Sequence, residues 1–217
     1  MGPNVLRLIC DSDFPAVLGQ GIVWNASLLA PLHVLDESRC MGQRNVALYQ
    51  AGGQKTVVRK LRLIRRFPCS DAATFSVDCD LPGRSLKFAK QVHEGEKVIV
   101  QWLASRGEGI CVEAIISSIR EIVKIDRYEY LSAGGTVVRT RNISAIFLDK
   151  RMPLGSSGAP VYQSDSGNIL GFVHGNAAAN DSLAICLDPR SLWADRASTN
   201  EIGVRTAEIS PECHASF

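Results

Sequence analysis

The sequence predicts an all-β fold, built as a sandwich or as barrels, from three observations. Short segments rich in Val and Ile, each of strand length, recur along the chain. Turn signals such as Gly52-Gly53, Pro82-Gly83 and Gly134-Gly135 separate them. Convincing long helical patterns are lacking. Many short strands with few helices are typical of sandwiches and barrels.

The predicted elements follow from this pattern in chain order. Strands are expected over residues 21–24, 57–64, 97–103, 112–119, 143–148, 169–174 and 183–187. Two short helices are expected, over 33–38 and 189–196; the second begins at Asp188-Pro189, which suits a cap and a first-turn proline. Residues 81–96 hold Pro82, Gly83, Gly95 and several charges, and predict a linker. The expected division is therefore 1–80, the linker, 97–205 and a polar tail over 206–217.

Composition excludes several classes of protein. Of the 217 residues, 46% are hydrophobic and 21% charged, which is globular composition, and the net charge of +2 favours neither nucleic acid nor membrane. No apolar run is long enough for a membrane span. The seven cysteines form no CxxC and the four histidines are scattered, so no metal site is expected. The first residues do not resemble a signal peptide, which predicts an intracellular, reducing compartment with free thiols.

The sharpest motif is PLGSSGAPVY, residues 153–162. Acyl transfer by serine needs an exposed hydroxyl and two backbone N–H groups aimed at the developing oxyanion. Ser157 would be the nucleophile, and Gly155 and Ser157 would supply the N–H groups. Gly158 would leave room for the substrate. Taken alone, the pattern fits a glycine-serine turn that enters a strand equally well.

A serine hydroxyl needs a base, and the base needs a carboxylate that orients it. Among the histidines at 33, 93, 174 and 214, His33 follows two strand-like segments. Asp71 opens an alternating apolar run over 71–77. Asp78 and Asp80 lie on the same segment and remain alternatives, although Asp78 would face the opposite side of a regular strand.

Four segments carry a resemblance to a known family. Residues 19–34 run from Gly-Gln-Gly-Ile-Val to Leu-His-Val, residues 71–75 read DAATF, and 155–161 are followed by GNILG at 167–171. Residues 94–100 are similar to the opening strand of a second barrel. With the order His, Asp, Ser, the chain resembles the trypsin/chymotrypsin-like serine proteases. The resemblance implies two antiparallel six-stranded β-barrels with few short helices, an active site between them, and no cofactor. It also implies that His33 is the general base and that Asp71 orients it.

Departures from the family narrow the resemblance. Val34 stands where secreted members have a cysteine, and Ser156 stands where zymogen forms have an aspartate that pairs with a new N-terminus. Such features resemble the bacterial-type and RNA-viral branches. A viral protease that processes its own polyprotein in the host cytoplasm is therefore one expectation.

The resemblance also implies a substrate pocket. His174, Gly175 and Asn176 would form one wall, and Arg151 and Leu154 would lie near its base. In some relatives a histidine in this region reads Glu or Gln before the scissile bond, because a ring N–H can donate to a side-chain oxygen. Here it falls one residue later. Arg151 would favour acidic substrates, or be a solvated loop charge.

Two other functions stay open. Residues 55–66 carry six cations and no acid, which fits a solvated strand face or a phosphate-binding surface for RNA, although no aromatic residues interleave for base stacking. The chain could then be an inactive protease-like module that binds peptides or RNA. A hydrolase of another fold ranks last, since the required βαβ alternation is lacking.

Overall fold

The all-β prediction is confirmed by the computed structural model of the chain. The structure describes residues 5–10, 16–31, 46–49, 55–58, 62–67, 72–77, 86–104, 107–130, 136–176 and 182–186. Within these residues it has thirteen strands and no helix, and no segment there is a helix that could cross a membrane. The helices expected over 33–38 and 189–196, and the tail at 206–217, lie outside the described residues.

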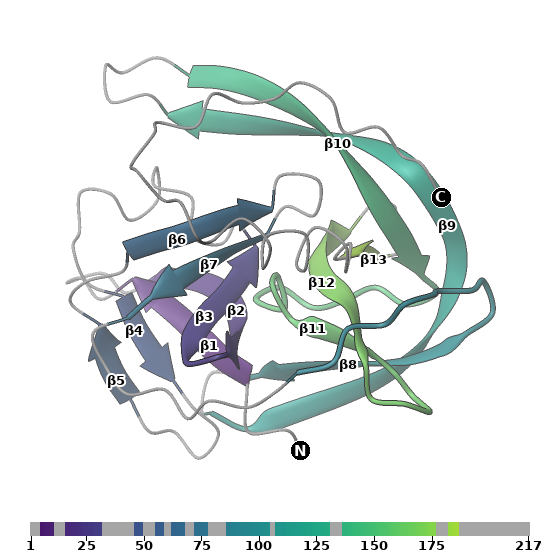
Figure 1. Ribbon diagram of the computed structural model, residues 1–217, viewed down its shortest axis with the longest axis horizontal. Coiled ribbons are helices and arrows are strands. Elements are labelled where there is room, and N and C mark those ends of the chain that lie inside the picture. The colour runs from purple at the N-terminus through teal and green to yellow at the C-terminus, as the bar shows by residue number, and fades with distance from the viewer. Residues whose placement is uncertain are drawn as a thin grey trace, which may run out of the picture.

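The first half of the chain forms one antiparallel sheet of seven strands, in the order β5-β4-β1-β2-β3-β7-β6 (Figure 1). The strands are β1 (Val5–Cys10), β2 (Ala16–Trp24), β3 (Ser27–Pro31), β4 (Val46–Tyr49), β5 (Lys55–Val58), β6 (Arg62–Phe67) and β7 (Ala72–Ser76). The predicted strand 57–64 is thus two strands, which lie at opposite edges of the sheet. Val58 and Arg62 are only four residues apart, so their Cα atoms lie within about 14 Å of each other. The sheet must therefore curl to bring its two edges together. It has seven strands where six were expected, because the segment predicted as one strand over 57–64 is divided into β5 and β6.

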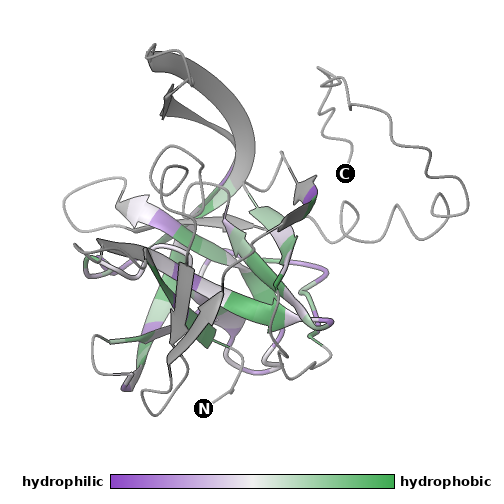
Figure 2. Cartoon of the chain, turned by 90° about the vertical axis from the view of Figure 1, so that its left-hand side faces the viewer, coloured by the Kyte–Doolittle hydropathy of each residue, from purple (hydrophilic) through white to green (hydrophobic). Residues whose placement is uncertain are grey.

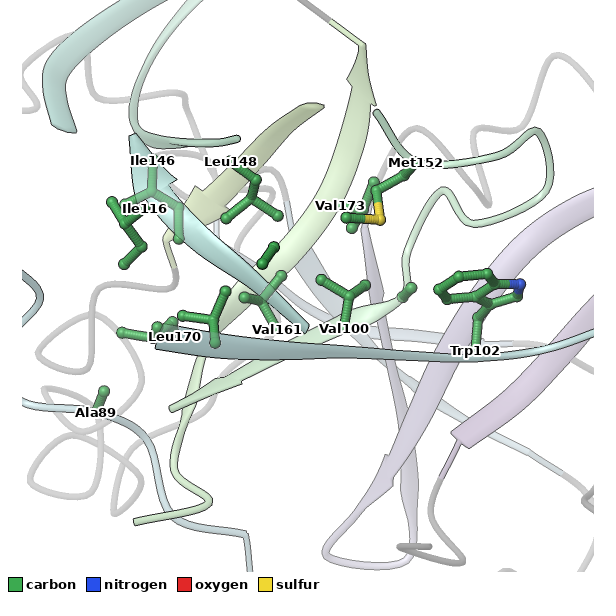
Figure 3. Close-up of a cluster of buried hydrophobic side chains, with 13 residues drawn as sticks. Ala89, Val100, Trp102, Ile116, Ile146, Leu148, Met152, Val161, Leu170 and Val173 are labelled. Atoms are coloured by element: carbon green, nitrogen blue, oxygen red, sulfur yellow. The ribbon is translucent and has the colours of Figure 1, made fainter. Parts of the chain in front are cut away.

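The second half closes into a six-stranded barrel, as expected, in the order β10-β13-β12-β11-β8-β9. Its strands are β8 (Lys97–Leu103), β9 (Gly109–Tyr130), β10 (Thr136–Leu148), β11 (Pro160–Gln163), β12 (Ile169–Asn176) and β13 (Ser182–Cys186). Strand β8 has the predicted bounds, because Val98, Val100 and Trp102 alternate into the barrel core. Figure 3 shows these last two among the side chains that fill the barrel.

Strands β9 and β10 extend far beyond the predicted segments 112–119 and 143–148. Residues 123–130 and 136–143 pair only with each other in the described structure, as a long ribbon that bows around the barrel and passes its end (Figure 1). Consecutive polar residues, such as Asp126-Arg127 and residues 139–142, interrupt the apolar alternation along this ribbon. The backbone of the two strands continues to pair along this stretch.

A second apolar cluster joins the two halves. It combines sheet residues (Val5, Ile22, Leu29, Ala72) with barrel residues (Leu103, Ile169, Phe172) and with Phe88 of the predicted linker. Phe88 forms an isolated parallel bridge with Ile169, and its ring meets Trp24 edge-on at 5.6 Å between centroids. Apolar segments accordingly meet in the middle of the molecule in Figure 2. The middle of the predicted linker is therefore packed between the halves, while its boundaries at 81 and 96 stay a prediction.

Candidate active site

Two successive tight turns carry the predicted nucleophile. Ser156 N–H donates to Pro153 C=O at 3.2 Å, and Ala159 N–H donates to Ser156 C=O at 2.7 Å. The third residue of each turn is a glycine with positive φ, +87° at Gly155 and +83° at Gly158. These values match type II turns, whose third position needs a residue that tolerates positive φ. The spacing of the two glycines in GSSG therefore produces the loop, and Ser157 is the second residue of the second turn.

The first turn sets the direction of the predicted oxyanion donor Gly155. A type I turn would reverse the peptide plane between Leu154 and Gly155, and would turn the Gly155 N–H by about half a rotation. The positive φ of Gly155 selects the other orientation. Within the described part of the chain, neither the Gly155 N–H nor the Ser157 N–H donates to a protein acceptor. Both amides are therefore available for a ligand oxygen.

Gly158 has a different role from the one expected. The sequence suggests that it leaves room for substrate, but Gly158 is buried, and a Cβ at this position would lie 2.0 Å from the backbone oxygen of Gln20. The Gln20 N–H also donates to Ser157 C=O at 2.7 Å, and Gly158 N–H donates to Val173 C=O at 2.7 Å. The absent side chain thus makes room for strand β2 of the other half, because the backbones approach too closely for a Cβ.

The Ser157 hydroxyl lies against the predicted pocket wall. Ser157 Oγ donates to the backbone oxygen of His174 at 3.2 Å. The structure therefore brings the hydroxyl of Ser157 to the backbone carbonyl of His174. Both His174 and Gly175 are half-buried. Asn176 ends β12, and its side chain is not described. A substrate-reading role for these three residues stays a prediction.

The other two residues of the predicted triad, His33 and Asp71, lie outside the described residues. Their neighbours are described. Pro31 ends β3 and pairs directly with Ala72, the first residue of β7. His33 comes two residues after Pro31 and Asp71 one residue before Ala72, so the chain leaves and re-enters the sheet at one point.

That point lies close to the nucleophile loop. A Cβ on Gly21 of β2 would lie 3.2 Å from Cβ of Ala30, one residue before the end of β3. Gln20, which binds the Ser157 carbonyl, is the residue of β2 directly before Gly21. Ser157 therefore lies near the end of β3 and the start of β7.

The segment before the loop borders an open surface cavity of about 350 Å³, lined by Arg151, Met152, Pro153 and Leu154. Leu154 is fully exposed and Arg151 is exposed, whereas Met152 is 2% exposed and packs in the barrel core. Asp149 is occupied elsewhere, since its Oδ1 accepts the Ile115 N–H at 2.7 Å. Arg151 is thus the charge at the cavity, next to the first turn.

Sequence reasoning missed Gln20. This side chain is fully buried where the two halves meet, and it binds the backbone of β8 and of the nucleophile loop. The available signal was an amide between two glycines inside an apolar strand. A buried polar side chain must be satisfied, so such a residue indicates a specific set of partners.

No known protein family and no curated protein matches the chain in sequence. Solved structures do match. The active form of the Rv3671c protease from M. tuberculosis has a TM-score of 0.60 and 21% identity over 93% of this chain and 82% of that one. The HtrA-type protease AlgW with a decapeptide has a TM-score of 0.63 and 18% identity over 88% and 63%. The MamO protease domain from Magnetospirillum magneticum has a TM-score of 0.62 and 13% identity over 88% and 95%. The chain therefore has the double-barrel fold of trypsin-like serine proteases.

Proposed function

We propose that the chain is a serine endopeptidase that cleaves peptide bonds through an acyl-enzyme. The observation that carries the proposal is the double turn, which holds the Ser157 hydroxyl beside two backbone N–H groups without a protein acceptor. A plain glycine-serine turn needs no such arrangement. The fold supports the proposal, and His33 and Asp71 adjoin the paired ends of β3 and β7.

In the proposed reaction, Ser157 Oγ attacks the carbonyl carbon of the scissile bond while His33 takes its proton. Asp71 holds the imidazole tautomer. The N–H groups of Gly155 and Ser157 stabilise the oxyanion, at about 3–4 kcal/mol for one donor. When the tetrahedral intermediate collapses, His33 gives its proton to the leaving amine. Water, deprotonated by His33, then hydrolyses the acyl ester and frees Ser157.

Labelling with a fluorophosphonate tests the nucleophile. The reagent phosphonylates an activated serine, so we expect one label per chain, mapped by mass spectrometry to Ser157 and absent in Ser157→Ala. Ser164→Ala is the matched control, because Ser164 is an exposed serine of the same barrel and its loss should leave labelling intact. An unlabelled but folded chain would favour the alternative, an inactive module that binds peptides or RNA.

For the substrate, we propose a preference for Glu or Gln before the cut. Arg151 is exposed beside the cavity that borders the nucleophile loop, and a cation there attracts acidic side chains. A peptide library should show the preference, and Arg151→Gln should weaken it for Glu more than for Gln. Equal cleavage after Phe, Lys and Glu would contradict it.

Two narrower expectations rest on sequence resemblance alone: processing of a viral polyprotein, and work in the reducing host cytoplasm. The similar structures do not bear on either, and both stay predictions, as does RNA binding by residues 55–66. A salt-independent or absent RNA shift would dismiss the last.

A further inference from the structure

Among the described residues, Gln20 of β2 makes more hydrogen bonds between the two halves than any other side chain. Its side chain is fully buried. Oε1 accepts the Leu103 N–H at 3.1 Å, and Nε2 donates to Leu103 C=O at 3.2 Å and to Gly155 C=O at 3.0 Å. Its backbone N–H donates to Ser157 C=O at 2.7 Å. One residue of the sheet thus binds the end of β8 and both turns of the nucleophile loop.

These bonds act on the peptide planes around the predicted oxyanion donors. The carbonyls of Gly155 and Ser157 belong to the planes on either side of the plane that carries the Ser157 N–H. Gln20 binds both carbonyls, one through its side chain and one through its backbone. The peptide plane that carries the Ser157 N–H lies between these two planes, so its rotation is restrained from both sides. The bond to Gly155 C=O also restrains the peptide plane that follows Gly155.

The three hydrogen bonds of this side chain require a glutamine at position 20. A primary amide offers one oxygen acceptor and two N–H donors on one planar group, which is the set that Leu103 and Gly155 use. Glutamate lacks the donors, methionine lacks both functions, and asparagine is one methylene shorter. A buried carbonyl or N–H that loses its partner carries the full cost of desolvation.

We propose that Gln20 is a positioning residue, which couples the docking of the two halves to the working orientation of the Gly155 and Ser157 N–H groups. It touches no substrate and acts through the loop. The inference rests on the proposed protease function. It says that Gln20, in the first half of the chain, helps to form the oxyanion site, whose N–H groups belong to the second half. Loss of Gln20 should slow acylation and leave the initial binding of a small reagent unchanged.

The test compares Gln20→Met with a matched variant, Arg7→Met. Arg7 also bridges the halves, since its Nη1 donates to Ala104 C=O at 3.1 Å, but it does not touch the nucleophile loop. Fluorophosphonate acylation is followed over a range of reagent concentrations. We expect Gln20→Met to lower the limiting acylation rate about 10- to 100-fold, less than a fully lost oxyanion donor, with an unchanged half-saturation concentration. Arg7→Met should acylate like the unaltered protein.

Gln20→Glu provides a second variant if the methionine form does not fold. It keeps the size and the acceptor for Leu103 N–H, but an ionised carboxylate has no donor and a protonated one has a single donor in place of two. It should show the same loss of acylation. Acylation at the unaltered rate in either Gln20 variant, or an equal loss in Arg7→Met, would overturn the proposal.

Amide hydrogen exchange separates failure of this inference from failure of the proposed function. If the unaltered chain is not labelled at all, the protease proposal fails. Exchange at the Ser156 and Ala159 amides, whose N–H groups close the two turns, then decides the role of Gln20. Faster exchange in the Gln20 variants, and not in Arg7→Met, supports positioning of the loop. Unchanged exchange rejects it.

Discussion

Gly158→Ala should be far more destabilising than an alanine at a glycine of the same backbone conformation. The new Cβ would lie 2.0 Å from the Gln20 backbone oxygen and 2.9 Å from its carbonyl carbon. These are backbone atoms, so no side chain can swing away. Either the nucleophile loop or β2 must move, and the 2.7 Å bond from Gln20 N–H to Ser157 C=O lies at the same contact.

Three effects contribute to the loss of stability in Gly158→Ala. A non-glycine residue with a positive φ costs roughly 1–2 kcal/mol. Overpacking of a tight contact costs about 1–3 kcal/mol, and a lost backbone hydrogen bond about 1 kcal/mol. We expect Gly158→Ala to lower the free energy of unfolding by about 4 kcal/mol in total, which is a large fraction of the stability of a domain.

Gly95→Ala is the matched control. Gly95 has φ of +80°, close to +83° at Gly158, and nothing lies within 4 Å of its added Cβ. Both variants carry the same cost of positive φ and the same change in unfolded-chain entropy, so their difference isolates the steric term. Urea unfolding followed by tryptophan fluorescence measures it. If the two variants lose equal stability, the close contact between Gly158 and Gln20 does not exist in solution.

Three further predictions concern the loop, an ionisable group and the core. Gly155→Ala disfavours φ of +87° and should turn the Gly155 N–H away, which lowers kcat by about 100- to 1,000-fold; kinetics at the unaltered rate would remove Gly155 from the oxyanion site. Burial, together with Coulombic repulsion from the nearby Cys111, raises the pKa of Tyr162 from 10.0 to about 12. Because the folded state holds this proton more tightly, the contribution is complete below pH 10, is lost as pH rises to about 12, and amounts to roughly 2–3 kcal/mol; denaturant unfolding across this range should show a drop that Tyr162→Phe lacks. Leu148→Ala removes a fully buried side chain of the barrel core and should cost about 2–5 kcal/mol, read from the same unfolding curves; a loss below 1 kcal/mol would mean that the core collapses around the cavity.

Patterns in short stretches of sequence predicted those elements whose conformation depends mainly on neighbouring residues. The alternation of Val98, Val100 and Trp102 predicted β8 with its bounds, because a half-buried strand must place every second side chain in the core. The two glycines of GSSG indicated the tight backbone of the nucleophile loop, since few other residues accept positive φ. Polar strands escaped the same reasoning. The ribbon of β9 and β10 continues through consecutive polar residues that interrupt the apolar alternation, and its pairing cannot be seen in either segment alone.

The amino-acid sequence by itself thus determined the all-β class, the serine-bearing turn and the order of the candidate residues His33, Asp71 and Ser157. Only the tertiary structure decided that Gly158 faces the backbone of Gln20 and that a buried glutamine ties β2 to the loop that carries Ser157. The reason is distance along the chain: Gln20 and Gly155 are 135 residues apart, and no local preference of either residue encodes the other. Contacts between two halves arise from how their surfaces fit, which becomes visible only when both are folded.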